Sequence, residues 1–154
     1  MTDSKPQDQR RMKDFPVRSP GAKVGGIVYF GRMLDKIRVH AKGELPADYL
    51  PKLGSGFDGW CVDFLGIVYP DLVNRVKEDG TDEEILQWCF QRGRKPTDGE
   101  IYVWDEFMRK RGWDDELSET LIRRKKEAGM AGRSEILTMF NFIDADEDRD
   151  LDSN

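Results

Sequence analysis

The residues best suited to form a chemical site lie on one predicted helix near the start of the chain. Arg32, Asp35 and Arg38 are spaced by three residues, which places them along one face of a helix. The planar guanidinium group of arginine binds carboxylates and phosphates in a fixed geometry. We therefore predict that Asp35 holds one or both arginines toward an anionic ligand. The alternative is a solvated face, on which such pairs contribute about 0.2–0.5 kcal/mol each.

A glycine-rich stretch precedes this helix. Residues 21–26 have the glycine separation of a phosphate-binding loop, but Ile27 and Val28 stand where that loop needs a lysine and a hydroxyl residue. We therefore expect the glycines to form a tight turn and not to bind a nucleoside triphosphate. The candidate ligand-binding residues are Arg18, Arg32, Asp35, Arg38 and Asp58.

No catalytic residue is predicted. Two flanking arginines stabilise the ionised form of Asp35, which makes that carboxylate a poor proton acceptor at neutral pH. The chain has a single histidine, His40, and no Ser-His-Asp or Cys-His pattern. The alternative is a small enzyme that uses Asp35 or Asp58 with Tyr29 or Tyr49. A carboxylate in an enclosed apolar pocket, away from any arginine, would favour that alternative.

The sequence predicts no metal site and no cofactor. Cys61 and Cys89 lie among apolar residues and are expected to be buried thiols, because two cysteines form neither a disulfide framework nor a zinc site. The acidic run that begins at Asp144 resembles the first half of a calcium loop. Arg149 occupies its sixth position, where the loop needs glycine, so calcium binding is not expected.

The net charge of −5 comes from the C-terminal end of the chain. Residues 134–154 contain seven acidic residues and one arginine, which leaves 24 basic and 23 acidic residues in the rest. A nearly neutral body gives no reason to expect nucleic-acid binding. No apolar run approaches the ~20 residues that span a bilayer, and residues 1–16 lack an apolar signal core. We therefore expect no membrane association and a cytoplasmic location.

Helices are expected to position the candidate residues. Apolar residues recur at spacings of three and four along the chain, and glycines stand where helices should end. Thr81 and Thr97 each precede a glutamate by three residues, which is typical of a capping box at a helix start. Asp58, Asp114 and Ser134 are expected to cap three further helices.

We predict one all-α domain over residues 15–146, with six to seven helices and short loops. No two β-rich runs are joined by a recognisable hairpin turn, so no hairpin is expected. Residues 1–14 and 147–154 are expected to form tails, the second of them acidic.

Two short elements resemble a known family. They are Asp35-Lys36-Ile37-Arg38 and Phe64-Leu65-Gly66-Ile67. The other matching elements, in chain order, are Arg18-Ser19-Pro20, Gly25-Gly26, Asp58, Trp88, Arg92-Gly93 and Ile143-Asp144-Ala145-Asp146-Glu147. Over roughly residues 14 to 150, the chain resembles a bacterial family of small proteins catalogued as a domain of unknown function, number five thousand and sixty-nine. The resemblance implies a complete single domain and supplies no activity, substrate or cofactor.

The sequence thus predicts a binding module for a small anionic ligand or for an acidic segment of another protein. Its site would be a polar pocket near Arg18, Arg32, Asp35 and Arg38, closed by the irregular segment from Tyr49 to Asp58. A third class, an oligomeric scaffold, would be favoured by one exposed patch formed from the tryptophans Trp60, Trp88, Trp104 and Trp113. The oligomeric state is left open.

Overall fold

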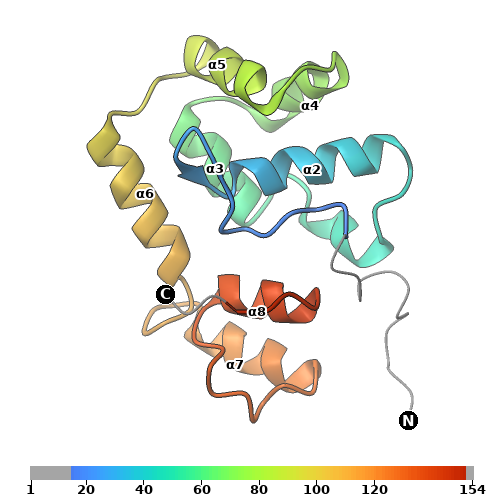
Figure 1. Ribbon diagram of the computed structural model, residues 1–154, viewed down its shortest axis with the longest axis vertical. Coiled ribbons are helices and arrows are strands. Elements are labelled where there is room, and N and C mark those ends of the chain that lie inside the picture. Colours follow the sequence, from blue (N-terminus) through green and yellow to red (C-terminus); the bar gives the residue numbers. More distant parts are fainter. Residues whose placement is uncertain (1–14, 152–154) are drawn as a thin grey trace.

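The computed structural model describes residues 15–151, and nearly every element in it is a helix (Figure 1). In chain order the elements are β1 (Lys23–Val24), β2 (Ile27–Val28), α2 (Phe30–Ala41), the 3-10 helix η1 (Ala47–Lys52), α3 (Phe57–Leu65), α4 (Tyr69–Lys77), α5 (Asp82–Arg92), α6 (Asp98–Lys110), α7 (Ser118–Glu127) and α8 (Met139–Asp146). The predicted all-α fold class is confirmed, with one small two-stranded sheet as the exception.

Helix α2 occupies the middle of the molecule. In Figure 1, α4 and α5 lie above it, α6 runs down the left side, and α7 and α8 lie below. Eight of its twelve residues are buried, including Arg32 and Lys36. Because a buried charge is costly unless it is paired, these two side chains must find partners inside the protein. Their partners define the polar interior described below.

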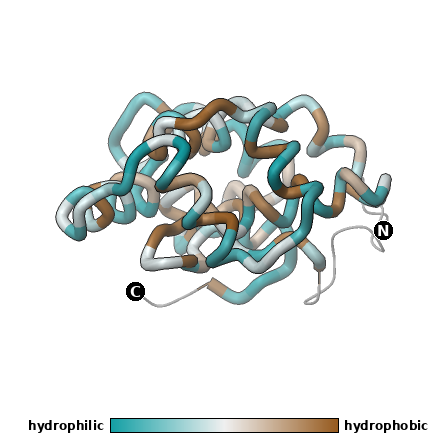
Figure 2. Tube along the Cα trace, turned by 90° about the horizontal axis from the view of Figure 1, so that it is seen from above, coloured by the Kyte–Doolittle hydropathy of each residue, from teal (hydrophilic) through white to brown (hydrophobic). Residues whose placement is uncertain are grey.

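The hydrophobic core forms around α2 and continues into two smaller clusters. The main cluster includes the buried side chains of Phe30, Leu34 and Leu65, and a second cluster lies between α7 and α8. Apolar and polar positions alternate along the helices in Figure 2, which fits amphipathic helices around a shared interior. Cys61 and Cys89 are free thiols inside the main cluster, as predicted.

A β-hairpin that was not predicted leads into α2. Val24 of β1 pairs with Ile27 of β2 in antiparallel register, and the turn between them is Gly25-Gly26. Both glycines have positive φ, 58° and 82°, which matches the type I′ turn that joins hairpin strands. Strands of two residues are too short to show an alternating pattern, so the sequence analysis recognised the turn and missed the hairpin.

Helix α6 covers the outer edge of this hairpin. The indole Nε1 of Trp104 donates a hydrogen bond to the backbone carbonyl of Val28 at 3.1 Å. The next residue, Asp105, accepts a hydrogen bond from the Val28 backbone N–H at 3.0 Å. Burial raises the pKa of Asp105 above its usual value. These bonds satisfy the backbone N–H and C=O groups of Val28, which face away from β1, and they fix the position of α6.

The two predicted capping boxes are present. The hydroxyl oxygens of Thr81 and Thr97 accept hydrogen bonds from the backbone N–H of Glu84 and Glu100, each at 3.1 Å. Each glutamate side chain in turn accepts from its threonine's backbone N–H. Local spacing therefore determines where α5 and α6 begin.

The other three predicted caps are wrong. Helix α3 begins before Asp58, which is fully buried and faces partners from elsewhere in the chain. Asp114 does not cap α7; the side chain of its neighbour Asp115 accepts from the backbone N–H of Leu117 instead. Thr138, not Ser134, caps α8. Where several capping residues stand close together, spacing alone does not select the one that is used.

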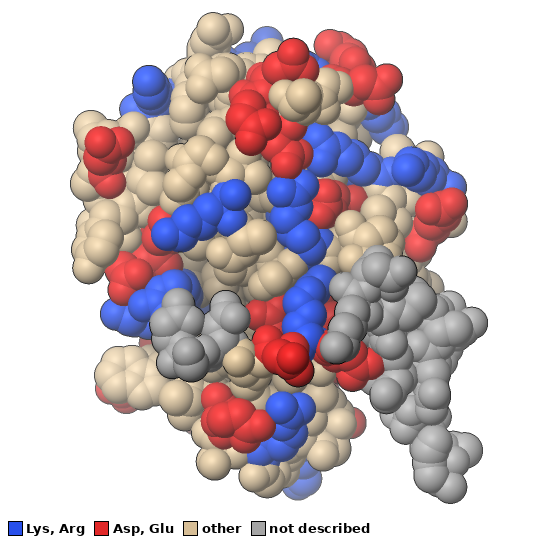
Figure 3. Space-filling view, in the orientation of Figure 1, with Lys and Arg blue, Asp and Glu red and all other residues tan. Residues whose placement is uncertain are grey.

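None of the described helices combines the length and apolar character needed to cross a membrane. On the face shown in Figure 3, basic and acidic side chains are interspersed and do not gather by sign. This distribution fits the nearly neutral body expected from the sequence.

Candidate functional site

Asp35 holds two arginines, but not the predicted pair. It accepts hydrogen bonds from Nε and Nη2 of Arg18 at 2.8 and 2.9 Å, and from the Arg18 backbone N–H at 2.9 Å. Arg38 lies 3.6 Å from the same carboxylate. A Cβ at Gly31 would lie 2.7 Å from Arg18 Nη1, so glycine there leaves room for the Arg18 side chain in this position. Asp35 thus pairs with arginines, with Arg18 in the place expected for Arg32, and its role in presenting them to a ligand stays a prediction.

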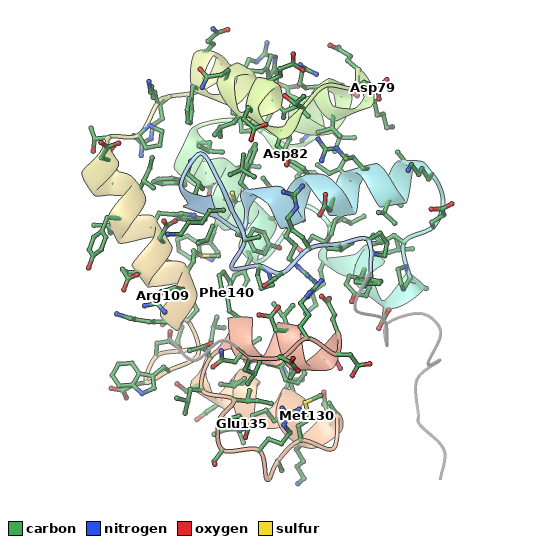
Figure 4. All side chains as sticks on the ribbon, in the orientation of Figure 1. Asp79, Asp82, Arg109, Met130, Glu135 and Phe140 are labelled. Atoms are coloured by element: carbon green, nitrogen blue, oxygen red, sulfur yellow. The ribbon has the colours of Figure 1, made fainter. Side chains whose placement is uncertain are left out.

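Asp82, the first residue of α5, completes this cluster and lies between α5 and α2 in Figure 4. Its carboxylate is 2.8 Å from both Arg18 and Arg38. Burial alone raises the pKa of Asp82, but hydrogen bonds from the two arginines lower it below its usual value. Each guanidinium group thus already has two carboxylate partners. The cluster joins α2 to α5 and leaves little capacity for a ligand.

Arg32 pairs with a residue far away in the sequence. Its Nη1 and Nη2 donate to the two carboxylate oxygens of Glu147 at 2.9 and 2.7 Å, a two-pronged ion pair. The side chains are only 5% and 2% exposed. Arg32 also donates to the backbone carbonyl of Arg18 at 3.1 Å. Arg32 therefore lies in the interior next to the Asp35 cluster, which it contacts through the Arg18 backbone.

Glu147 lies inside the protein, although the sequence analysis placed it in an acidic tail. Besides Arg32, it accepts hydrogen bonds from the Tyr49 hydroxyl at 2.6 Å and from Arg149. Arg149 also donates to the backbone carbonyl of Val17. Burial alone raises the pKa of Glu147, but these donors, Arg32 first, lower it below its usual value. The ion pairs explain how a carboxylate from an acidic run can be buried.

A second buried group of polar side chains joins Tyr29, Lys36 and Asp58. The Tyr29 hydroxyl donates to Asp58 Oδ1 at 2.7 Å and accepts from Lys36 Nζ at 2.9 Å. Lys36 Nζ lies 2.8 Å from the same Oδ1 of Asp58. The other carboxylate oxygen, Oδ2, accepts from the Gly54 backbone N–H at 3.0 Å. We call Tyr29, Lys36 and Asp58 the buried triad.

The backbone of Tyr29 is strained. Its φ of 73° and ψ of −28° place it in the left-handed region, which is a clear outlier for a bulky side chain and costs about 1–3 kcal/mol. The ring is held by Phe57, edge to face at 5.7 Å, and by Phe140 of α8, labelled in Figure 4, at 6.3 Å. Strained residues held by their surroundings are typical of functional sites.

The two groups meet at one pocket of about 360 Å³. Its lining includes Tyr29 and Lys36 of the triad, Arg32, Tyr49 and Glu147, together with Asp48, Lys52, Ser55, Gly56, Phe57, Trp60, Arg111, Leu117, Thr120, Arg124, Met139, Phe142, Ile143 and Asp146. Asp58 is fully buried behind this lining and does not reach the pocket. A volume of this order suits a small molecule.

Positive charge predominates among the pocket residues. Five cationic and three acidic side chains line it. Arg32 is neutralised by Glu147. Lys36 is neutralised by Asp58, and Arg111 by Asp115 and Glu116, all three of which lie outside the pocket. Lys52 and Arg124, in contrast, form no ion pair with any described residue. These two cations are the groups most free to bind an anion.

Another hollow, of about 710 Å³, lies between α3 and α6 and is mainly apolar. Its lining includes Trp60 and Trp104. Of the four tryptophans, Trp60 and Trp113 are exposed, Trp88 is half-buried and Trp104 is buried, so they do not form one exposed patch. This hollow lacks the converging polar groups of the first pocket. Among residues 15–151 no cluster of histidine, cysteine and carboxylate side chains could hold a metal ion.

The structure thus divides the predicted site residues between two places. Arg32 lines the pocket and Asp58 supports it from behind, whereas Arg18, Asp35 and Arg38 form the cluster with Asp82 outside the pocket. The predicted covering segment, from Tyr49 to Asp58, does contribute to the pocket wall.

Sequence reasoning missed four cationic pocket residues: Lys36, Lys52, Arg111 and Arg124. One signal was available for Lys36, because it stands between Met33 and Val39 at three-residue spacing, on a face that is otherwise apolar.

Comparison with known proteins gives one match. The sequence model of the family described as Domain of unknown function (DUF5069) matches residues 14–149. No curated protein matches the chain.

Proposed function

Since this chain belongs to the DUF5069 family, whose description assigns no activity, we propose from its geometry that it binds a small anionic ligand in the 360 Å³ pocket. The observation that carries this proposal is the pair of pocket cations, Lys52 and Arg124, that have no acidic partner among the described residues. Buried Arg32 and Lys36 line the same cavity, each beside the carboxylate that neutralises it. Cations that line a cavity and have no acidic partner attract anions.

The pocket favours a small ligand over an acidic protein segment. A volume of 360 Å³ lies near the lower end of the roughly 300–1,000 Å³ found for small-molecule sites. The polar groups that converge there include hydroxyl groups as well as cations, which suits a ligand with both an anionic and a neutral polar part.

A thermal-shift screen at low salt tests the proposal. The probes are inorganic phosphate, sulfate, small carboxylates and nucleotides, and a ligand that binds only the folded protein raises the melting temperature. Lys52→Ala and Arg124→Ala should each weaken binding about tenfold, because each removes one charged hydrogen-bond donor. Lys42→Ala and Arg123→Ala, which change charges outside the pocket, are the matched controls. Equal effects from pocket and control variants would contradict the proposal.

A small enzyme is the second candidate. The sequence analysis required a carboxylate in an enclosed pocket, away from any arginine, and Asp58 meets part of that requirement. It is fully buried, and its hydrogen-bond partners are Tyr29, Lys36 and Gly54, with no arginine among them. Its surroundings are polar, however, and Asp58 does not line the pocket. Any proton it exchanges with a ligand must therefore pass through Tyr29 or Lys36.

The oligomeric scaffold is not favoured by its own criterion, since Trp104 is buried and Trp88 is half-buried. The expected cytoplasmic location stays a prediction.

A further inference from the structure

We propose that Lys36 is a nucleophile that forms an imine with the carbonyl group of the bound ligand, and that Tyr29 and Asp58 move the protons. This inference rests on the proposed function and makes it more specific. The ligand class is a small compound that carries both a carbonyl and an anionic group, such as a 2-oxo acid.

The three groups are close enough to exchange protons directly. Lys36 Nζ lies 2.8 Å from Asp58 Oδ1 and 2.9 Å from the Tyr29 hydroxyl, which itself lies 2.7 Å from Asp58 Oδ1. Each group therefore contacts the other two. A nucleophile with an adjacent base, itself held by a third group, is the arrangement that covalent catalysis requires.

Lys36 is also placed to meet a ligand. It and Tyr29 line the pocket, whereas Asp58 lies behind them. The Lys36 ammonium has three N–H groups, and among the described residues its hydrogen-bond partners are Tyr29 and Asp58. One N–H direction is left for the pocket. Because the side chain is only 6% exposed, its amine is held in one place and does not move freely in solvent.

The environment favours the reactive form of the amine. Burial lowers the pKa of Lys36 below its usual value, against the opposing effect of Asp58, and so raises the fraction of neutral amine. Burial also raises the pKa of Tyr29, which keeps the phenol protonated and able to donate. These directions agree with the roles that the geometry gives to Lys36 as nucleophile and Tyr29 as proton carrier.

The step balances without an oxidant or a reductant. Lys36 first gives a proton to Asp58, and the neutral amine then adds to the carbonyl carbon to form a C–N bond. One amine proton moves to the former carbonyl oxygen through the Tyr29 hydroxyl, which gives a neutral carbinolamine. Asp58 returns its proton as the C–O bond breaks and water leaves. The product is a positively charged imine beside an ionised Asp58, so the site keeps its original charges.

Lys52 and Arg124 supply the binding site for the anionic group of the ligand. Holding that group would keep the carbonyl carbon of the ligand close to Lys36. Both cations line the same pocket and lack an acidic partner among residues 15–151. They would bind the anionic group while the carbonyl carbon faces Nζ.

Reductive trapping tests the inference on the full chain. The protein is incubated at neutral pH with glyoxylate and cyanoborohydride, which reduces an imine to a stable amine, and the modified residue is located by peptide mass mapping. The expected result is one adduct per chain, at Lys36. Labelling confined to exposed lysines such as Lys42 would overturn the inference.

Two variants separate the chemistry from the fold. Lys36→Arg keeps the positive charge and should abolish trapping, and Tyr29→Phe keeps the ring and should slow trapping at least about tenfold, because it removes a general acid. Their melting temperatures, measured alongside, show whether each is folded. Undiminished trapping in folded Tyr29→Phe would overturn the role of Tyr29.

The same experiment distinguishes the two proposals. If glyoxylate raises the melting temperature and no adduct forms at Lys36, the imine inference fails and anion binding stands. If glyoxylate and the other anions leave the melting temperature unchanged and no adduct forms, both fail. Acetate, which carries the anionic group without a reactive carbonyl, should compete with glyoxylate and slow the trapping at Lys36.

Discussion

Glu147 joins parts of the chain that are far apart in the sequence. It is 2% exposed and binds Arg32, which is 115 residues away, and Tyr49, which is 98 residues away. Through Arg149 the same cluster reaches the backbone at Val17. One buried carboxylate therefore holds α8, α2, η1 and the N-terminal stretch together. Removing its charge would leave Arg32 buried without compensation.

We expect Glu147→Gln to lower the free energy of unfolding by about 3 kcal/mol, because an uncompensated buried charge is costly. Urea unfolding measures this change. The control is Glu135→Gln, whose partner is Arg133 on an exposed surface, and it should cost less than about 1 kcal/mol. Equal losses in the two variants would show that the Arg32–Glu147 pair has no special role.

Helix starts are decided locally in some elements and not in others. The capping boxes of α5 and α6 follow directly from sequence spacing. Helix α8 differs, because Ser134 and Thr138 are both suitable caps and only Thr138 accepts a bond from a helix N–H, that of Asn141 at 3.1 Å. The intervening residues form turns that deliver Thr138 to the helix start.

Thr138→Ala should therefore lower the free energy of unfolding by about 1 kcal/mol, the usual cost of losing an N-cap. Ser134→Ala, at an exposed position, should change it by less than about 0.5 kcal/mol. Thermal or urea unfolding of both variants measures the difference. A larger loss of stability in Ser134→Ala than in Thr138→Ala would mean that Ser134 caps the helix, as first expected from the sequence.

The hairpin turn can be tested with a matched pair of glycines. Gly25 has φ of 58°, and a Cβ there would lie 2.4 Å from Leu86 of α5. Gly43 has φ of 73° and open space around it. Gly43→Ala should cost about 1–2 kcal/mol for its backbone conformation alone, whereas Gly25→Ala should cost about 1–3 kcal/mol more because of the clash. Similar losses in urea unfolding would argue that α5 does not pack against the turn.

At the scale of the whole molecule, buried ion pairs couple stability to pH. The pKa of Glu147 is lower in the folded protein than its unfolded value of about 4.3. The folded state thus binds this proton less readily than the unfolded state does. The stability that Glu147 contributes is fully present above about pH 5 and is lost as the pH falls through its folded pKa.

The difference in unfolding free energy between the wild type and Glu147→Gln should therefore be largest near pH 6–7 and shrink toward pH 3. Parallel urea titrations across this range measure it, and the other titrating groups cancel because both proteins share them. A difference that stays constant with pH would exclude Glu147 as the source of acid sensitivity.

Short-range patterns in the sequence predicted much of the architecture. Apolar spacing indicated the helices, and the threonine–glutamate pairs marked where α5 and α6 begin, because these features depend on residues within one or two turns. Asp35 could be recognised as a clamp from the charges near it. Glu147 was assigned to the acidic tail, although it is buried in the structure. The reason is that composition alone does not reveal that a carboxylate has a buried arginine as partner.

The identity of each charge's partner was decided only in three dimensions. Arg32 and Arg38 are about 1.7 turns apart on α2. The first nevertheless faces Glu147 and the second Asp82, because different elements pack around the helix at the two positions. Lys36 pairs with Asp58 because α3 brings that carboxylate to the side of α2. The sequence by itself determined the helices and their apolar faces, since these follow from local geometry and burial. The pocket is formed by residues that are tens of positions apart in the sequence, and local spacing does not encode such contacts.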